Sequence, residues 1–135
     1  MLDTNLDVEK LKKLQFKIMK DVAASALIPL MRIGDQLGLF QKLSELGPIN
    51  SKKFAEEAKV DERYLREWLY ALSATDFVSY DGEKEEFSLS PEQRAVFADE
   101  QGPANMMGAY EVLAGQVYAE EKVLEAFKTG KGVAY

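Results

Sequence analysis

The stretch PINSKKFAEEAKVDERYLREWLYALSATDFVSYDGEKEEFSLSP, residues Pro48–Pro91, decides the fold of this chain of 135 residues. Its apolar residues first recur at the spacing of two short helices and, after Asp76, change to the alternating spacing of strands. Two short helices followed by a strand, a turn and a second strand are the order of a winged helix-turn-helix. We therefore predict a mainly α fold, a winged helix-turn-helix with a small β-hairpin wing, flanked by long N- and C-terminal helices.

The two short helices have recognisable start signals. Asn50 or Ser51 can offer a side-chain oxygen to the unpaired N–H groups of the first helix, and Asp61 can do so for the second. We expect the two helices to pack on each other through Ala55 and residues of the second helix such as Leu65 and Trp68. The predicted apolar face of the second helix comprises Tyr64, Leu65, Trp68, Leu69 and Leu72.

Two β-prone runs, Phe77–Tyr80 and Phe87–Ser90, form the predicted wing. Asp81 and Gly82 lie between them, and this pair supplies a residue that accepts a positive φ, as tight hairpin turns require. Ile49 is expected to add a third short strand at the edge of the hairpin.

The composition excludes several classes of site. The chain has no cysteine and no histidine, so it lacks disulfides, a thiol nucleophile, and the commonest general base and metal ligand. No metal site is expected. The N-terminal residues MLDTNLDVEK carry acids where a signal peptide needs bases, and no apolar run approaches membrane-spanning length. We expect a cytoplasmic protein without a membrane partner.

A long amphipathic helix is predicted from Leu6 to about Leu27. Lysines occupy most of one face, but Asp7 and Glu9 are interspersed, which favours a solvated surface over a basic patch for nucleic acid or membrane. A compact winged helix offers a terminal helix nowhere to bury the other, apolar face, so we predict a homodimer. Its interface is expected to include Leu11, Leu14, Ile18, Val22, Ile33 and Leu37.

A second helix is expected to start around Pro29, to continue through Phe40 and to stop at Gly47. Gly34 and Gly38 lie four residues apart on this helix and would let another backbone approach closely. Two interpretations remain open, namely a tight helix crossing within one chain and a seam between two copies of the chain.

The C-terminal part begins with a capped helix start at Ser90–Gln93 and continues as an apolar stretch from about Met106 to Tyr118. A cluster of methionine and tyrosine at helical spacing is typical of a core. The alternative is an adaptable wall for an apolar ligand, because thioethers adjust their shape and tyrosine combines a ring with a polar tip. The candidate substrate-lining residues are Met106, Met107 and Tyr110.

No catalytic or cofactor-binding residue can be assembled from the sequence. Gly130-Lys131-Gly132 follows a helix rather than a strand, so it lacks the context of a phosphate-binding loop. Nucleic acid is also disfavoured as a partner. The outer face of the second helix sums to zero charge, the wing turn 81–86 sums to minus three and the whole chain to minus six, whereas phosphate binding needs positive charge.

Several of these segments together resemble the N-terminal region of bacterial class I S-adenosylmethionine-dependent methyltransferases. They are IGDQLGLF at 33–40, AE at 55–56, ERYLREWL at 62–69, the wing, and FKTGKGVAY at 127–135. The similarity runs in order from about residue 25 to the end, and ERYLREWL is its most specific part. In that family a winged-helix domain precedes a Rossmann-like catalytic domain, dimerises through its N-terminal helices and closes over the substrate.

The resemblance implies three segments: dimerisation helices at 1–47, the winged helix-turn-helix at 48–91, and C-terminal helices with the start of a linker at 92–135. It further implies a homodimer, a C-terminal Rossmann-like domain as partner, and a small-molecule substrate and S-adenosylmethionine for the full enzyme. The glycine-rich cofactor loop would follow Tyr135, so residues 1–135 are expected to bind no cofactor and to be inactive alone. The alternative function is that of a small dimeric winged-helix transcription regulator.

Overall fold

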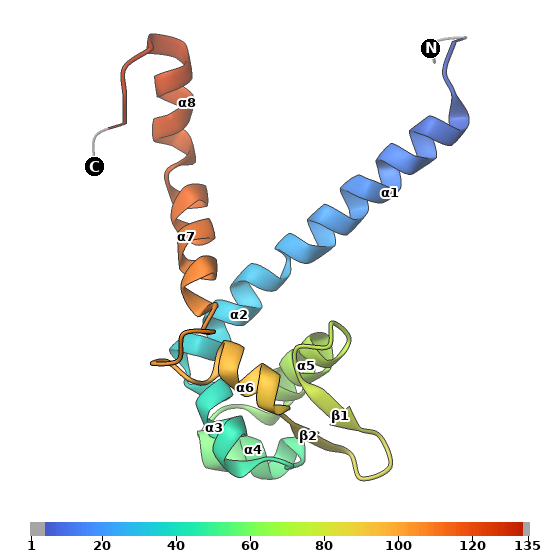
Figure 1. The fold of residues 1–135 in the computed structure, drawn as a ribbon, viewed down its shortest axis with the longest axis vertical. Helices are drawn as coiled ribbons and strands as arrows, with labels where there is room; N and C mark the ends of the chain where they lie inside the picture. Colours follow the sequence, from blue (N-terminus) through green and yellow to red (C-terminus); the bar gives the residue numbers. More distant parts are fainter. Residues whose placement is uncertain (1–4, 134–135) are drawn as a thin grey trace.

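The computed structural model describes residues 5–133. Residues 1–4 and 134–135, the outer ends of the predicted N- and C-terminal segments and the last two residues of the FKTGKGVAY run, lie outside the described residues. Figure 1 shows a head from which two helical arms diverge. The first arm is α1 (Val8–Ser25), and the second arm is α7 (Met107–Tyr118) followed by α8 (Glu120–Thr129). The head comprises α2 (Leu27–Gln36), α3 (Leu39–Leu46), α4 (Ser51–Ala58), α5 (Glu62–Ser73), β1 (Ser79–Asp81), β2 (Glu86–Ser88) and α6 (Pro91–Phe97).

The predicted winged helix-turn-helix is confirmed. The side chain of Asn50 accepts a hydrogen bond from the Lys53 N–H at 3.0 Å and so caps α4, and Asp61 accepts one from the Tyr64 N–H at 3.2 Å and caps α5. Lys59 ends α4 with a φ of 56°, a left-handed conformation that glycine usually supplies at this position. The turn of the motif therefore forms without a glycine.

The core of the head forms around α5. Leu65, Trp68, Leu69 and Leu72 are buried, as the spacing predicts. Tyr64, which was expected on the same face, is 79% exposed. At 100° per residue it lies roughly a quarter turn around the helix from the centre of the buried face.

Trp68 has partners that the sequence did not indicate. It was expected to join α5 to α4, and its ring also contacts α2 and α3. The ring lies 5.2 Å from that of Phe40 in an edge-on arrangement, and its Nε1–H donates a hydrogen bond to the Leu30 carbonyl at 2.8 Å. A Cβ added to Gly34 would overlap the Trp68 ring and would lie 2.7 Å from Cε2 of Phe40. Gly34 therefore makes a close approach within one chain, which supports the first of the two interpretations of the glycine pair.

The helix predicted from Pro29 to Gly47 is in fact two helices. Gly38 has a φ of 64° and separates α2 from α3, so it acts as a turn residue and not as part of a helix surface. Pro29 lies in the first turn of α2, where its missing N–H costs nothing, and Gly47 terminates α3 as predicted.

The wing is a two-stranded antiparallel hairpin in which Tyr80 pairs with Phe87. Both strands are shorter than the predicted runs. The first strand begins two residues later than predicted, because Asp76 has a positive φ and the Phe77 N–H still donates a hydrogen bond to the Leu72 carbonyl near the end of α5. The turn also differs: Asp81 accepts hydrogen bonds from the N–H groups of Glu83 and Lys84, and the positive φ falls on Glu85 instead of Gly82. The expected edge strand is confirmed as a single antiparallel bridge between Ile49 and Phe87.

A reciprocal cap starts α6 as the sequence predicts. Ser90 Oγ accepts a hydrogen bond from the Gln93 N–H, and the Gln93 side chain accepts one from the Ser90 N–H. Met107 then begins α7, which packs against α2. None of the helices within residues 5–133 is long and apolar enough to cross a lipid bilayer.

Gly34→Ala tests the close approach of Trp68. The new methyl group would collide with the Trp68 and Phe40 rings, and we expect the variant to lose about 1–3 kcal/mol of unfolding free energy in urea denaturation. Gly108→Ala is the matched control, because a Cβ at that helical position meets nothing within 4 Å, and it should be neutral or gain up to about 1 kcal/mol. Equal stability of the two variants would contradict the packing described here.

Candidate functional site

The face of the helix-turn-helix that reads DNA in other proteins is electrically neutralised here. Arg66 forms an ion pair with Glu62 at 3.2 Å, and the Glu62 carboxylate also accepts a hydrogen bond from Ser51 at 2.8 Å. Asp81 lies beside Lys84 in the wing turn, at 4.0 Å. Arg66 and Lys84 are therefore each matched by a carboxylate of their own segment, which reduces the positive charge that these two side chains offer to a phosphate backbone.

The first arm presents an unburied apolar surface. No residue of α1 is buried, although the helix is amphipathic over 18 residues. Of the predicted interface residues, Leu11 is half-buried. The exposed ones are Leu14, Ile18 and Val22 on α1, Ile33 on α2, and Leu37, which directly follows α2. Their place in a dimer interface stays a prediction. An interface requires accessible side chains, and the exposed ones among these residues meet that requirement.

Two further apolar side chains of α1, Phe16 and Met19, were not predicted as interface residues. They are 64% and 68% exposed and lie on the side of the helix next to Val8. Their spacing of three residues is typical of one helix face. Lysines lie around them, however, since Lys20 stands above the Phe16 ring, 5.9 Å from its centre, and Lys12 lies between Val8 and Phe16 on the helix surface. Because of these lysines, the sequence did not indicate that the apolar surface extends to Phe16 and Met19.

The second arm is also largely uncovered. Met107 and Ala114 are the buried residues of α7, and α8 has none. The exposed large apolar residues of the second arm are Val112, Leu113, Val117, Tyr118, Val123, Leu124 and Phe127. Phe127 reaches 87% exposure, which is unusual for a large aromatic ring in a protein that acts alone.

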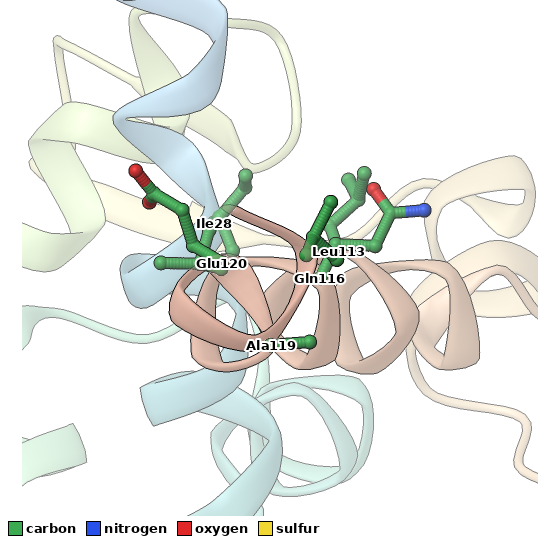
Figure 2. A pocket seen from close by; sticks show the side chains of 7 residues that line it. Ile28, Leu113, Gln116, Ala119 and Glu120 are labelled. Atoms are coloured by element: carbon green, nitrogen blue, oxygen red, sulfur yellow. The ribbon is translucent and has the colours of Figure 1, made fainter. Parts of the chain in front are cut away.

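An open hollow of about 530 Å³ lies where the second arm meets the head. Figure 2 shows the side chains of Ile28, Leu113 and Glu120 around it, and Val117 and Val123 complete its apolar lining. The elements that form it are α2, α7 and α8, so segments far apart in the sequence contribute to one surface.

An ion pair fastens the second arm to the head. Arg32 on α2 donates two hydrogen bonds to the carboxylate of Glu111 on α7, at 2.9 and 3.3 Å. The hydrogen bond to Glu111, with a smaller contribution from Tyr118, raises the pKa of Arg32 above its ordinary value. Nearby, burial raises the pKa of the Asp35 carboxyl, with a smaller contribution from the charges of Glu100 and Glu111. This pair has no local signal in the sequence, because 79 residues separate its members.

The three candidate substrate-lining residues do not share one surface. Met107 is 6% exposed and belongs to the core cluster of the head, whereas Met106 precedes α7 and is 55% exposed. Tyr110 is half-buried against the core, and burial raises the pKa of its hydroxyl. A role in a substrate wall stays a prediction, and Met106 and Tyr110 remain accessible for it. Residues 5–133 contain no group of three or more Asp or Glu side chains arranged to hold a metal ion.

A family model described as the Rv2258c-like winged HTH domain matches residues 23–98. The chain is also similar to a crystal structure of a protein from Nostoc punctiforme PCC 73102 that carries a provisional assignment as an O-methyltransferase. The TM-score is 0.60 and the sequence identity 22%, over 87% of this chain and 34% of that one. The chain thus spans about a third of the length of that protein, and a likeness at this identity shows the fold. The comparison with curated protein sequences finds no match.

Met107→Ala distinguishes a core residue from a ligand wall. Because its side chain is buried among the core residues of the head, we expect a loss of about 2–5 kcal/mol of unfolding free energy. Met106→Ala is the matched control and should change stability by less than about 0.5 kcal/mol, since its side chain is exposed. Chemical denaturation of both variants measures the difference, and a stable Met107→Ala variant would return Met107 to the candidate wall.

Proposed function

Since the chain belongs to the family of Rv2258c-like winged HTH domains, we propose that it is the dimerisation and substrate-side domain of an S-adenosylmethionine-dependent methyltransferase. The proposal assigns it no catalytic centre and no cofactor site. The observation that carries it is the exposure of apolar side chains along the whole of both arms. Such surfaces mark places where another protein surface belongs.

This exposure supports the proposed homodimerisation. The head has its own closed core, whereas α1 and α8 contain no buried residue. A helix with an apolar face is stabilised mainly by packing that face, so α1 needs a partner in order to be stable at its full length. A second copy of the chain supplies that partner at equal concentration and with closed symmetry.

The methyltransferase context rests on fold and sequence likeness. The similar structure from Nostoc punctiforme has roughly three times as much chain, which supports a neighbouring domain for residues 1–135 in the natural protein. In the proposed enzyme, that domain is Rossmann-like and holds S-adenosylmethionine, and Met106 and Tyr110 line the substrate side. The methyl acceptor would be a small molecule.

DNA binding is the function that the fold alone suggests, and the electrostatics oppose it. Arg66, which a DNA-reading helix would present to phosphate, is held by Glu62, and the wing turn carries more acids than lysines. We therefore do not propose a transcription regulator for this chain, because a fold does not define a function without a suitable site.

Light scattering should find a homodimer at micromolar concentration, with an interface that buries on the order of 1,200 Å² or more. Ile18→Glu places a charge on the exposed apolar side of α1, and we expect it to raise the dimer dissociation constant at least about tenfold. Ala24→Glu adds the same carboxylate on the lysine-bearing side of α1 and should have little effect. A monomeric wild-type chain at these concentrations would refute dimerisation.

The natural reading frame should continue beyond Tyr135 into a β-strand and a glycine-rich turn. Calorimetry should detect stoichiometric binding of S-adenosylmethionine to the extended protein and none to residues 1–135, because a cofactor site of this class needs a strand-to-helix phosphate or nucleotide loop. Cofactor binding by residues 1–135 would overturn the assignment. A continuation into an unrelated domain would do the same.

A further inference from the structure

We propose that α1 of one protomer packs along the second arm, α7 and α8, of a second copy, with apolar side chains of α1 in the hollow at Leu113 and Val117. This inference rests on the proposed dimerisation and defines how the two copies meet. The obvious alternative is a dimer in which the two α1 helices pack only on each other.

The apolar surface of α1 is too wide for a single contact. At about 100° per residue, Leu14, Ile18 and Val22 lie on one side of the helix and Phe16 on the other, with Met19 between them. Together they cover roughly half of the helix circumference, whereas a helix packed on one surface needs an apolar stripe of about 100°. All five side chains are exposed, so α1 requires two neighbouring surfaces, and a lone α1 partner would cover only one of them.

α7 has an apolar surface that residues 5–133 of its own chain leave uncovered. Glu111 is its one charged residue, and Arg32 holds that carboxylate. A helix that is apolar nearly all round belongs in a core, yet Val112 and Val117 are exposed. Figure 1 shows α1 diverging from α7 and α8 of the same chain, so the apolar surfaces of the two arms point to contacts between copies.

The charges of the two arms have opposite signs. Among residues 8–25, five lysines stand against Glu9 and Asp21, whereas residues 107–129 carry four glutamates and two lysines. Glu120 and Glu121 take part in no ion pair within residues 5–133, and Glu120 stands at the rim of the hollow. An α1 helix on the second arm of a partner therefore brings unlike charges together, whereas two α1 helices side by side bring lysines together.

The dimensions are compatible with such an exchange. At about 1.5 Å per residue, the 18 residues of α1 span about 27 Å, which matches the combined length of α7 and α8 to within about 10 Å. Two-fold symmetry then repeats the contact, because each copy contributes its α1 to the second arm of the other. The uncovered surfaces of both arms are buried at the same time.

The absence of cysteine from the chain allows a direct test by cross-linking. The Ile18→Cys chain and the Val117→Cys chain are prepared separately, refolded together and treated with a short bis-maleimide. Each chain then has one thiol, so every cross-link joins two copies. We expect the mixed product, identified by mass spectrometry, to exceed by several-fold that of a control mixture of the Ala24→Cys and Val117→Cys chains.

Light scattering on the same mixtures separates the possible failures. A dimer that yields only the Ile18→Cys homodimer product would leave the proposed dimerisation intact and overturn the exchange of α1. A dimer with neither product would also overturn it. A monomer would refute the proposed dimerisation itself.

Salt provides an independent measurement on the unmodified chain. If unlike charges face each other across the interface, the dimer dissociation constant should rise as sodium chloride is increased, because salt screens the attraction. An α1 pair with facing lysines predicts the opposite trend. A dissociation constant that falls with added salt would therefore overturn the proposal.

Discussion

The indole ring of Trp68 occupies the space that any side chain at position 34 would need, and its N–H donates a hydrogen bond to the Leu30 carbonyl. This contact sets the position of α5 relative to α2, because both a steric limit and a directed bond act at the same place. α2 in turn leads directly from α1 and is joined to α7 through Arg32 and Glu111. The direction of both arms thus depends on a tryptophan of the helix-turn-helix.

The same contact explains why a DNA-binding fold can serve another purpose. In this chain the inward face of α5 supports the arms, and its outward face is neutralised by the pair of Glu62 and Arg66. Nothing on that outward face has to be positive, since the proposed partner is a second copy of the chain. In the proposed dimer, the helix-turn-helix would hold the arms in position and the apolar arms would make the contacts between the two copies.

The head and the arms should also differ in what stabilises them. The head closes its own core around fully buried Phe40, Phe54 and Phe87, whereas α1 and α8 bury nothing within one chain. Helices in proteins owe most of their stability to the packing of an amphipathic face, so in the proposed dimer the arms should become ordered together with the interface. Protein concentration would then affect the arms more than the head.

Local chemistry made much of the head predictable. Asn50, Asp61 and Ser90 cap their helices through contacts within three residues, and such signals are legible in a linear sequence. The break at Gly38 and the exposure of Tyr64 could not be predicted. The same spacing of apolar residues can continue across a turn, and it does not show whether a neighbouring segment covers a given side chain. The partners of Gly34 lie up to 34 positions away, and Glu111 lies 79 positions from Arg32. Only the packed chain could therefore show that the glycine faces a tryptophan ring and that α2 holds α7. The sequence established which side chains are apolar along the arms, and the tertiary structure decided which of them stay uncovered, because burial depends on where the chain returns in space.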